Sequence, residues 1–279
     1  HRFVEEPLTF LIEIVSNLDR ASKTALALIF IRGGTLDSPI ELTPSEAKAL
    51  EYFGAWLQEA RDALGALNGS FVILSQSGGK RIWTFKHPTI SDAYASIIAD
   101  DPEFLDFYLA WTRIEKLMGE VTCGSVGLEG VRVVVPTNRY DIFMGRLTEA
   151  KHRRDVLIFL ATRCARDFLA LYLERNADLA ESLTDVSSYL SESVKVQVLC
   201  RLQAEGLLNA EWRLRFVRKA QSLAIETPDT SMFSIAEIRA LFTTEEIESL
   251  RQLVREEVIP HLVSVISRHQ EEIDEETDP

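Results

Sequence analysis

Apolar positions recur at helical spacing through the first part of the chain. Pro7–Leu18 predicts a helix with proline in its first turn. Ala21–Gly34 predicts a second helix that ends at its two terminal glycines. A third helical pattern runs up to Gly69 and predicts one or two helices. It starts at a capping-box signature, in which Thr43 is followed by proline and then by Glu46 three positions on.

The pattern changes to that of β-structure between Ser70 and His87. Two short apolar runs flank the sequence QSGGK, and Gly78-Gly79 is a strong signal for a β-hairpin. Helices followed by a hairpin have the order of a winged-helix module, with the hairpin as the wing. The expected recognition helix does not present a phosphate-binding face. It carries Glu46, Glu51, Glu59 and Asp62 against Lys48 and Arg61.

From Thr89 onward the pattern is nearly all helical. Glycines at 124, 127 and 130 interrupt it, and residues 131–138 predict one isolated strand or extended connector. Helices separated by short breaks, without a fixed period, favour an α-helical bundle or a solenoid-like region. We therefore predict a mainly α fold, in which a winged-helix module with one β-hairpin precedes that region. The expected helices span residues 91–101, 102–119, 139–150, 153–176, 177–183, 185–208, 211–227 and 235–272.

Three segments are expected along the chain. Residues 1–110 form a helix plus a winged-helix domain, and residues 111–270 form an α-helical sensor or interaction domain. Residues 271–279 form an acidic disordered tail. The boundary between the domains is expected between residues 98 and 120, and the glycine-rich stretch 124–130 is a second candidate hinge.

The composition is that of a globular protein with an acidic surface. Apolar residues make up 46% of 279 residues, the net charge is −13 and the pI is near 5.0. This charge argues against non-specific nucleic-acid binding by the whole chain, although a local basic patch stays open. The three cysteines are odd in number and far apart, which disfavours a disulfide framework or a zinc site and fits a reducing compartment. They are Cys123, Cys164 and Cys200.

The first residues do not resemble a signal peptide, because Glu5, Glu6 and Pro7 occupy the place of its apolar core. The chain has no apolar run of membrane-spanning length. These features predict a cytoplasmic protein with no membrane partner. The abrupt start at His1 suggests a fragment of a longer protein.

Known catalytic motifs are absent from the sequence. Ser77–Arg81, SGGKR, lacks the spacing of a phosphate loop and falls inside the predicted hairpin. No nucleophile elbow, zinc-protease motif or dinucleotide fingerprint occurs. The five histidines lack metal-ligand spacing, and neighbouring carboxylates on a helix point apart. We therefore expect no enzyme, no metal site and no cofactor in this chain by itself.

Two basic stretches interrupt the acidic background, Lys151–Arg154 and a longer one with interleaved aromatic residues. On a helix the second presents either an ordinary exposed face with a buried aromatic residue or a contact for a partner or nucleic acid. Its basic residues are Arg213, Arg215, Arg218 and Lys219.

The segment FKHPTISDAY leads from the wing into a helix. Thr89 and Asp92 are predicted to form a reciprocal cap, since each side chain can reach the other's backbone amide. Capping leaves His87 unexplained. Its ring either packs the corner by bonding a backbone carbonyl or meets a phosphate near the helix amides.

This segment resembles the end of the nucleotide-binding module of bacterial STAND NTPases, relatives of the NB-ARC and NACHT proteins. Phe85, His87, Pro88, Thr89 and Asp92 match an aromatic-x-His-Pro-[Ser/Thr]-x-x-Asp signature. The resemblance covers residues 7–106 well. The later stretches VKVQVLCRLQAEGLL and IRALFTTEEIESLRQLVREEVIPHL are similar to the helical region of some members, but less closely.

The resemblance implies a role in signal transduction. His87, with Thr89 and Asp92, would sense ADP held by an upstream P-loop domain, in the same protein or another chain. The helical region would bind a ligand or a protein partner. Antiviral defence and transcriptional signalling are the contexts implied. The P-loop, the Walker B acid and the arginine sensors would precede His1, so ADP or ATP binding belongs to a longer parent protein.

Two other interpretations stay open. One is a winged-helix nucleic-acid-binding regulator with a helical dimerisation domain. The other is an interaction scaffold whose helical region offers a concave surface.

Overall fold

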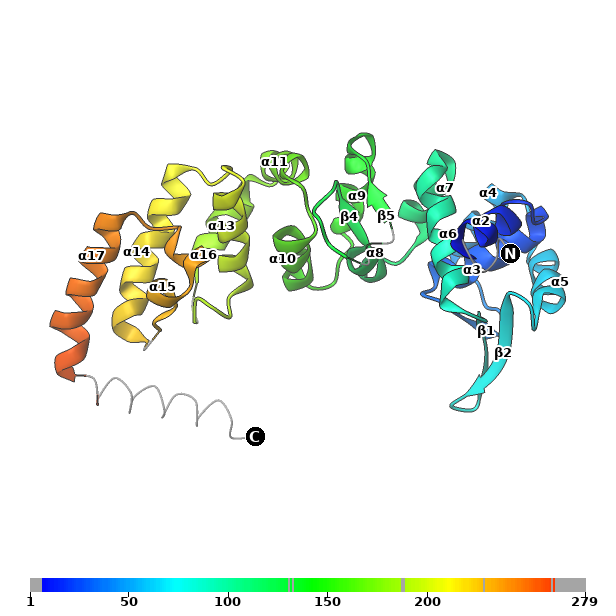
Figure 1. Ribbon diagram of the computed structural model, residues 1–279, viewed down its shortest axis with the longest axis horizontal. Helices are drawn as coiled ribbons and strands as arrows, with labels where there is room; N and C mark the ends of the chain where they lie inside the picture. The colour runs from blue at the N-terminus through cyan, green and yellow to red at the C-terminus, as the bar shows by residue number, and fades with distance from the viewer. Residues whose placement is uncertain are drawn as a thin grey trace. The chain divides into compact units, whose positions relative to one another are not determined.

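The computed structural model describes residues 7–261 and 263, except residues 130, 132, 187, 188, 228 and 262 (Figure 1). The fold is mainly α-helical, as the sequence predicts. Two compact units make up the chain, one ending at Lys151 and the next beginning at His152. The tail predicted to be disordered, residues 271–279, lies outside the described residues.

The first unit contains the element order of a winged helix: a helix, a strand, two helices and a hairpin. Ser77 pairs with Lys80 across a two-residue turn, where Gly78 and Gly79 have φ values of 56° and 81°. These left-handed values suit the turn that joins twisted strands, so the predicted hairpin is confirmed. Figure 1 shows the hairpin projecting from the helices. The elements are α2 (Pro7–Ser16), α3 (Arg20–Ile31), β1 (Thr35–Ser38), α4 (Pro44–Phe53), α5 (Leu57–Leu67), β2 (Val72–Ser77) and β3 (Lys80–Phe85).

Strand β1 was not predicted from the sequence. It pairs antiparallel with β3 and gives a sheet of order β1-β3-β2. Within β1, Leu36 is the buried side chain and lies opposite Trp83. Four residues with a single buried apolar position are too short for an alternating pattern to be visible.

Helix α3 forms the centre of the first unit. Every residue from Thr24 to Ile31 is buried, as expected for a helix that is apolar on all sides. The Phe30 ring lies 5.3 Å from the Tyr94 ring and 5.4 Å from the Tyr108 ring, centroid to centroid. The Lys116 ammonium lies 4.4 Å from the centroid of the Phe30 ring, so a charged group is also packed against this core.

The first unit extends well beyond residue 110, where the sequence prediction placed its end. Arg146 on α9 donates to the carbonyls of Leu109, Ala110 and Thr112, at the end of α7. A distant arginine thus closes the C-terminus of α7 and keeps α9 in this unit. The further elements are α6 (Pro88–Asp100), α7 (Pro102–Trp111), α8 (Ile114–Glu120), β4 (Val121–Cys123), β5 (Val133–Val135), η1 (Thr137–Arg139) and α9 (Tyr140–Leu147).

The strand expected to be isolated has a partner. β5 pairs in parallel with β4, from Val121 opposite Val133 to Cys123 opposite Val135. β5 also contacts α6. Residues 124–129, part of the candidate hinge, therefore lie between two paired strands of one unit, and the units divide after them.

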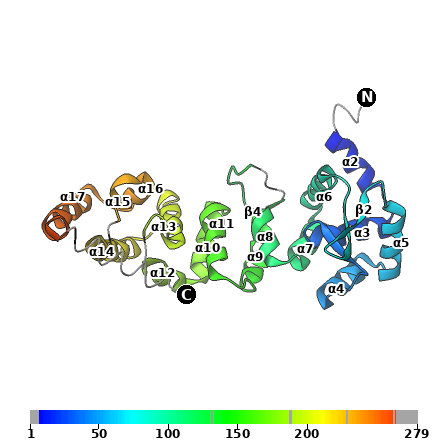
Figure 2. The ribbon, with the colours of Figure 1, turned by 90° about the horizontal axis from the view of Figure 1, so that it is seen from below.

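The elements of the second unit, among its described residues, are all helices (Figure 2). Contacts join α10 to α13, α11 to α12, α12 to both α13 and α14, and α14 to α17. Such packing of successive helices agrees with the predicted bundle or solenoid-like region. The elements are α10 (Arg153–Thr162), α11 (Arg166–Arg175), α12 (Ala177–Thr184), α13 (Val194–Ala204), α14 (Ala210–Glu226), α15 (Ser231–Ser234), α16 (Ala236–Arg239), α17 (Thr244–Leu253), η2 (Val254–Val258) and η3 (Ile259–His261).

Three long predicted helices are broken in the structure, and a fourth begins late. Residues 102–119 divide into α7 and α8, and the helix expected from residue 235 divides into α16 and α17. Residues 153–176 divide into α10 and α11. Cys164 lies between the two helices in the sequence, and its side chain is fully buried. The expected helix from 185 begins only at Val194, because Asp229 holds the preceding loop. The Asp229 carboxylate accepts from the backbone N–H groups of Leu190, at 2.6 Å, and Ser231, at 2.8 Å.

Among the described residues, no helix combines the length and apolar character needed to cross a membrane.

Candidate functional site

His87 occupies the corner between β3 and α6. Its backbone is extended, with φ −144° and ψ 143°, and it is the N-cap residue of α6. Pro88 takes the first helical position, where the missing N–H costs nothing and the fixed φ favours the helix. The chain therefore turns into α6 directly after His87, and the imidazole is presented at the start of the helix.

The His87 ring is held by its neighbour Thr89. The Nδ1 atom accepts a hydrogen bond from the Thr89 N–H at 3.3 Å and lies 2.8 Å from Thr89 Oγ1. Because an amide N–H only donates, the neutral ring carries its proton on Nε2. His87 is exposed, and no described residue takes a hydrogen bond from Nε2. The corner thus presents one oriented N–H donor to the outside.

The predicted cap formed by Thr89 and Asp92 is wrong, because His87 is itself the cap. The Thr89 amide donates to the imidazole. Asp92 lies beyond the first turn, on an exposed position of α6. Of the three proposed sensing residues, the structure brings His87 and Thr89 together and leaves Asp92 apart.

The first turn of α6 has few amides left for an anion. Pro88 has none, the Thr89 N–H meets His87 Nδ1, and the Ile90 N–H lies 3.1 Å from the His87 carbonyl. The expectation of unsatisfied amides beside the ring is therefore not met here. A phosphate at this corner would receive a single hydrogen bond, from His87 Nε2, which is a sensing contact and not a binding cradle.

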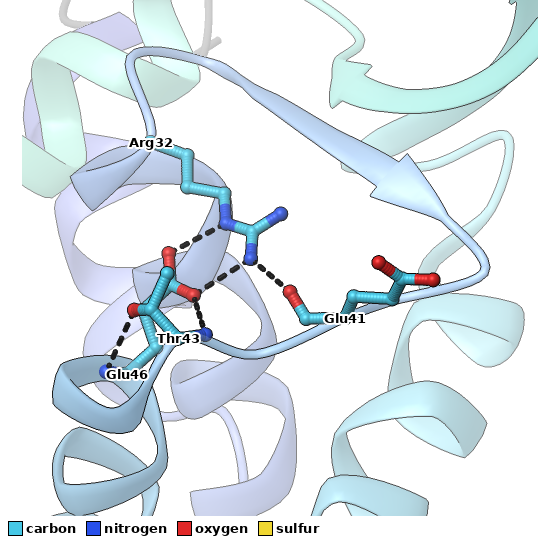
Figure 3. A network of polar contacts seen from close by, with 4 residues as sticks. All are labelled: Arg32, Glu41, Thr43 and Glu46. Atoms are coloured by element: carbon cyan, nitrogen blue, oxygen red, sulfur yellow. Dashed lines mark hydrogen bonds and ion pairs between the residues drawn. The ribbon is translucent and has the colours of Figure 1, made fainter.

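A polar network joins the C-terminal end of α3 to α4 (Figure 3). The Arg32 guanidinium forms a bidentate ion pair with the Glu46 carboxylate: Nε donates to Oε1 at 2.6 Å, and Nη2 donates to Oε2 at 2.7 Å. The Thr43 N–H donates to Glu46 Oε2 at 2.8 Å, and Thr43 Oγ1 accepts from the Glu46 N–H at 3.3 Å. The predicted capping box is confirmed, and Arg32, which the sequence did not single out, completes it.

The opposite charges of Arg32 and Glu46 compensate each other in this network. The Arg32 side chain is 12% exposed and that of Glu46 is 7% exposed. Burial pushes the pKa of Glu46 upward, but hydrogen bonds from Arg32 and Thr43 outweigh burial and hold that pKa below its ordinary 4.5. The hydrogen bond to Glu46 likewise raises the pKa of Arg32. The network links the end of α3 to the start of α4. The Glu46 carboxylate already accepts hydrogen bonds from Arg32 and Thr43, so it is not free to bind a ligand.

The second group of predicted contact residues does not form one patch. Arg213 on α14 binds Glu246 on α17, with Nη1 at 2.6 Å from Oε2 and Nη2 at 3.1 Å from Oε1. Arg215 pairs with Glu211 at 2.8 Å on the surface. Arg218 is exposed and Lys219 is half-buried. Arg213 therefore joins two helices, and the interleaved Phe216 is fully buried in the core.

Cysteine and histidine positions give no sign of a metal centre in the described part of the chain. Cys123 and Cys164 are buried and Cys200 is half-buried, all as free thiols. Burial raises the pKa of the Cys200 thiol to about 11, so this group stays protonated at neutral pH. Of the five histidines, His1 and His269 lie outside the described residues.

Comparisons with protein-family models, with curated proteins and with solved structures found no match.

Proposed function

We propose that this chain is the regulatory and interaction part of a STAND-type signalling NTPase, and is not itself an enzyme. The observation that carries the proposal is the oriented Nε2–H donor of the exposed His87, at the point where a winged helix passes into α6. The resemblance of the surrounding sequence to the STAND signature supports the same assignment. In this proposal ADP is held mainly by a P-loop domain upstream, and the second unit receives a ligand or a protein partner.

His87 would act as a switch contact. One hydrogen bond to a phosphate is weak by itself, and it is worth about 1.5–3 kcal/mol when the acceptor is charged. That is enough to bias two positions of a winged helix by roughly ten- to a hundredfold without trapping either. Loss of the contact would release the winged helix as a rigid body.

The test is the His87→Ala substitution in a protein that carries this chain behind its P-loop domain. We expect ADP to dissociate about ten times faster from the variant, because one charge-assisted hydrogen bond is lost. Dissociation is measured by stopped-flow chase of a fluorescent ADP analogue. In the chain without a P-loop domain, His87→Ala is expected to leave ADP binding unchanged, since the first turn of α6 offers no cradle for a phosphate.

His152→Ala is the matched control, because His152 is also an exposed helix N-cap residue but begins α10 in the second unit. Its ADP release should equal that of wild type. Thr89→Val should reproduce part of the His87→Ala effect, because the hydroxyl beside Nδ1 is removed. Equal ADP release from wild type and His87→Ala would contradict the proposed role.

The nucleic-acid alternative finds less support in α5, the second of the two helices into which the expected recognition segment divides. Gln58, Glu59 and Asp62 are exposed on it. Arg61, its basic residue, donates to the Ile40 carbonyl at 3.1 Å. An acidic exposed face opposes the approach of phosphates, so winged-helix architecture here does not favour DNA binding.

A further inference from the structure

A pocket of about 400 Å³ lies at the N-terminal ends of α10 and α13, where the C-terminal end of α12 and the residues that follow it close one side. α10 and α13 pack against each other, and residues at the N-terminal end of each helix line the pocket. This volume falls within the range of small-molecule sites. The lining includes three cationic side chains, those of Arg153, Arg154 and Lys195.

Two of these cations donate hydrogen bonds to neutral acceptors. Arg153 Nη2 donates to Ser182 Oγ at 2.8 Å, and Lys195 Nζ donates to the Asp185 carbonyl. Arg154 is exposed. Within the described part of the chain, none of the three cations takes part in an ion pair. In a protein of net charge −13, three cations without ion pairs around one hollow point to an anionic ligand.

The positions of these cations are locally unfavourable. Arg153 and Arg154 are the first two residues of α10, and Lys195 is the second residue of α13. A positive side chain opposes the positive end of a helix dipole. Asp155 offsets this in α10, whereas the first turn of α13 has no acidic residue. An anion in the pocket would relieve the repulsion at both helices.

Two carboxylates in the pocket lining restrict which anionic ligands fit the pocket. Asp185 and Glu192 also line the pocket and are exposed. They would repel a bare polyanion, but they accept hydrogen bonds from hydroxyl groups. A ligand with one phosphate and several hydroxyl groups satisfies both kinds of lining.

We propose that this pocket binds a sugar phosphate, either free or as part of a nucleoside monophosphate. The cationic side chains and the first amides of α10 and α13 receive the phosphate, and Asp185 and Glu192 receive the sugar hydroxyls. The inference rests on the sensing role proposed for the second unit and gives that role a ligand class. Binding is measured on this chain alone, so its failure would leave the His87 proposal untouched.

Isothermal titration calorimetry of the purified chain tests the ligand class. The titrants are ribose 5-phosphate, AMP, inorganic phosphate and ribose. We expect ribose 5-phosphate to bind about ten times more tightly than inorganic phosphate, because the hydroxyl contacts add to the phosphate contacts. Ribose should give no heat of binding. Tighter binding of AMP than of ribose 5-phosphate would identify the nucleotide as the source of the sugar phosphate.

Arg154→Ala is the main variant, because the Arg154 side chain is exposed and forms no hydrogen bond or ion pair with the described residues, so that its loss should not unfold the protein. We expect its ligand-free Tm to stay equal or to rise by about 1–3 °C, since a charge opposing the helix dipole is removed. Its affinity for ribose 5-phosphate should fall about tenfold. Lys195→Met should weaken binding similarly, and His87→Ala should bind as wild type does.

Arg218→Ala is the charge-matched control, as Arg218 is exposed in the same unit and does not line the pocket. Its affinity should equal that of wild type. The proposal is overturned if no phosphate compound binds, if inorganic phosphate binds as tightly as ribose 5-phosphate, or if Arg154→Ala and Arg218→Ala behave alike.

Discussion

Glu46 shows how one side chain can serve two structural tasks. Its carboxylate closes the capping box of α4 and also receives the guanidinium of Arg32 from the end of α3. The capping half was predictable, because Thr43, proline and Glu46 stand at fixed spacing. The ion pair was not, since nothing in a single sequence links Arg32 to a residue fourteen positions away.

Glu46→Gln should destabilise the first unit by about 1–3 kcal/mol near pH 7, because a buried cation loses its counter-charge. The folded-state pKa of Glu46 is lower than its ordinary 4.5, so its charge stabilises the fold above that pH. This contribution is lost as the pH falls through the folded-state pKa. The difference between variant and wild type should therefore shrink as the pH falls below 4.5 and through the lower folded-state pKa.

Urea unfolding at several pH values measures this effect. Glu51→Gln is the control, because Glu51 is exposed on the same helix, and it should change stability by less than about 0.5 kcal/mol. A difference for Glu46→Gln that is independent of pH would mean that the carboxylate charge does not stabilise the fold.

His87 illustrates a residue whose importance the sequence indicated but whose geometry it did not. The pattern favoured Thr89 as the cap, since threonine is a preferred N-cap residue. The structure uses the imidazole instead, and Pro88 explains why: it occupies the first helical position and places the cap at His87, two residues before Thr89. Thr89 then falls inside the helix, where its amide reaches Nδ1.

At the scale of elements, the sequence predicted the turns, helix ends and caps that depend on residues close together in the chain. The paired glycines of the wing, the glycines that end α3 and the capping box of α4 all act over a few residues. Strand β1 was missed, because its partner β3 lies far along the chain. The pairing of β4 with β5 was missed, because each strand has only three residues, too few to show an alternating pattern. The pocket at α10 and α13 has the same origin: Arg153 and Arg154 stood in a visible basic stretch, whereas Lys195 comes from a distant helix.

Arg213 belongs to this scale because it joins α14 to α17. Arg213→Ala should destabilise the second unit by about 1–2 kcal/mol, since a two-pronged, half-buried ion pair and the bond to the Leu241 carbonyl are lost. Thermal unfolding followed by circular dichroism measures the effect. Arg218→Ala on the same helix should be nearly neutral. If both substitutions cost the same, the Arg213–Glu246 pair does not hold the two helices together.

At the scale of the whole molecule, each unit has its own core. Phe30, Tyr94 and Tyr108 centre the first, whereas Phe159, Phe168 and Phe216 are fully buried in the second. The proposed tasks divide in the same way, with the nucleotide contact at His87 and the sugar-phosphate pocket beside α10. A regulatory protein gains from this division, because each unit can respond to its own ligand.

Two cores predict two calorimetric transitions, because a unit with its own hydrophobic core can unfold cooperatively by itself. Differential scanning calorimetry with single variants assigns them. Glu46→Gln should lower the Tm of one transition by about 3–8 °C, and Arg213→Ala should lower that of the other by a similar amount, as expected for units of this size. Ribose 5-phosphate should raise the transition that Arg213→Ala lowers, because it binds the second unit only. A single transition that both substitutions shift equally would show that the two units unfold as one.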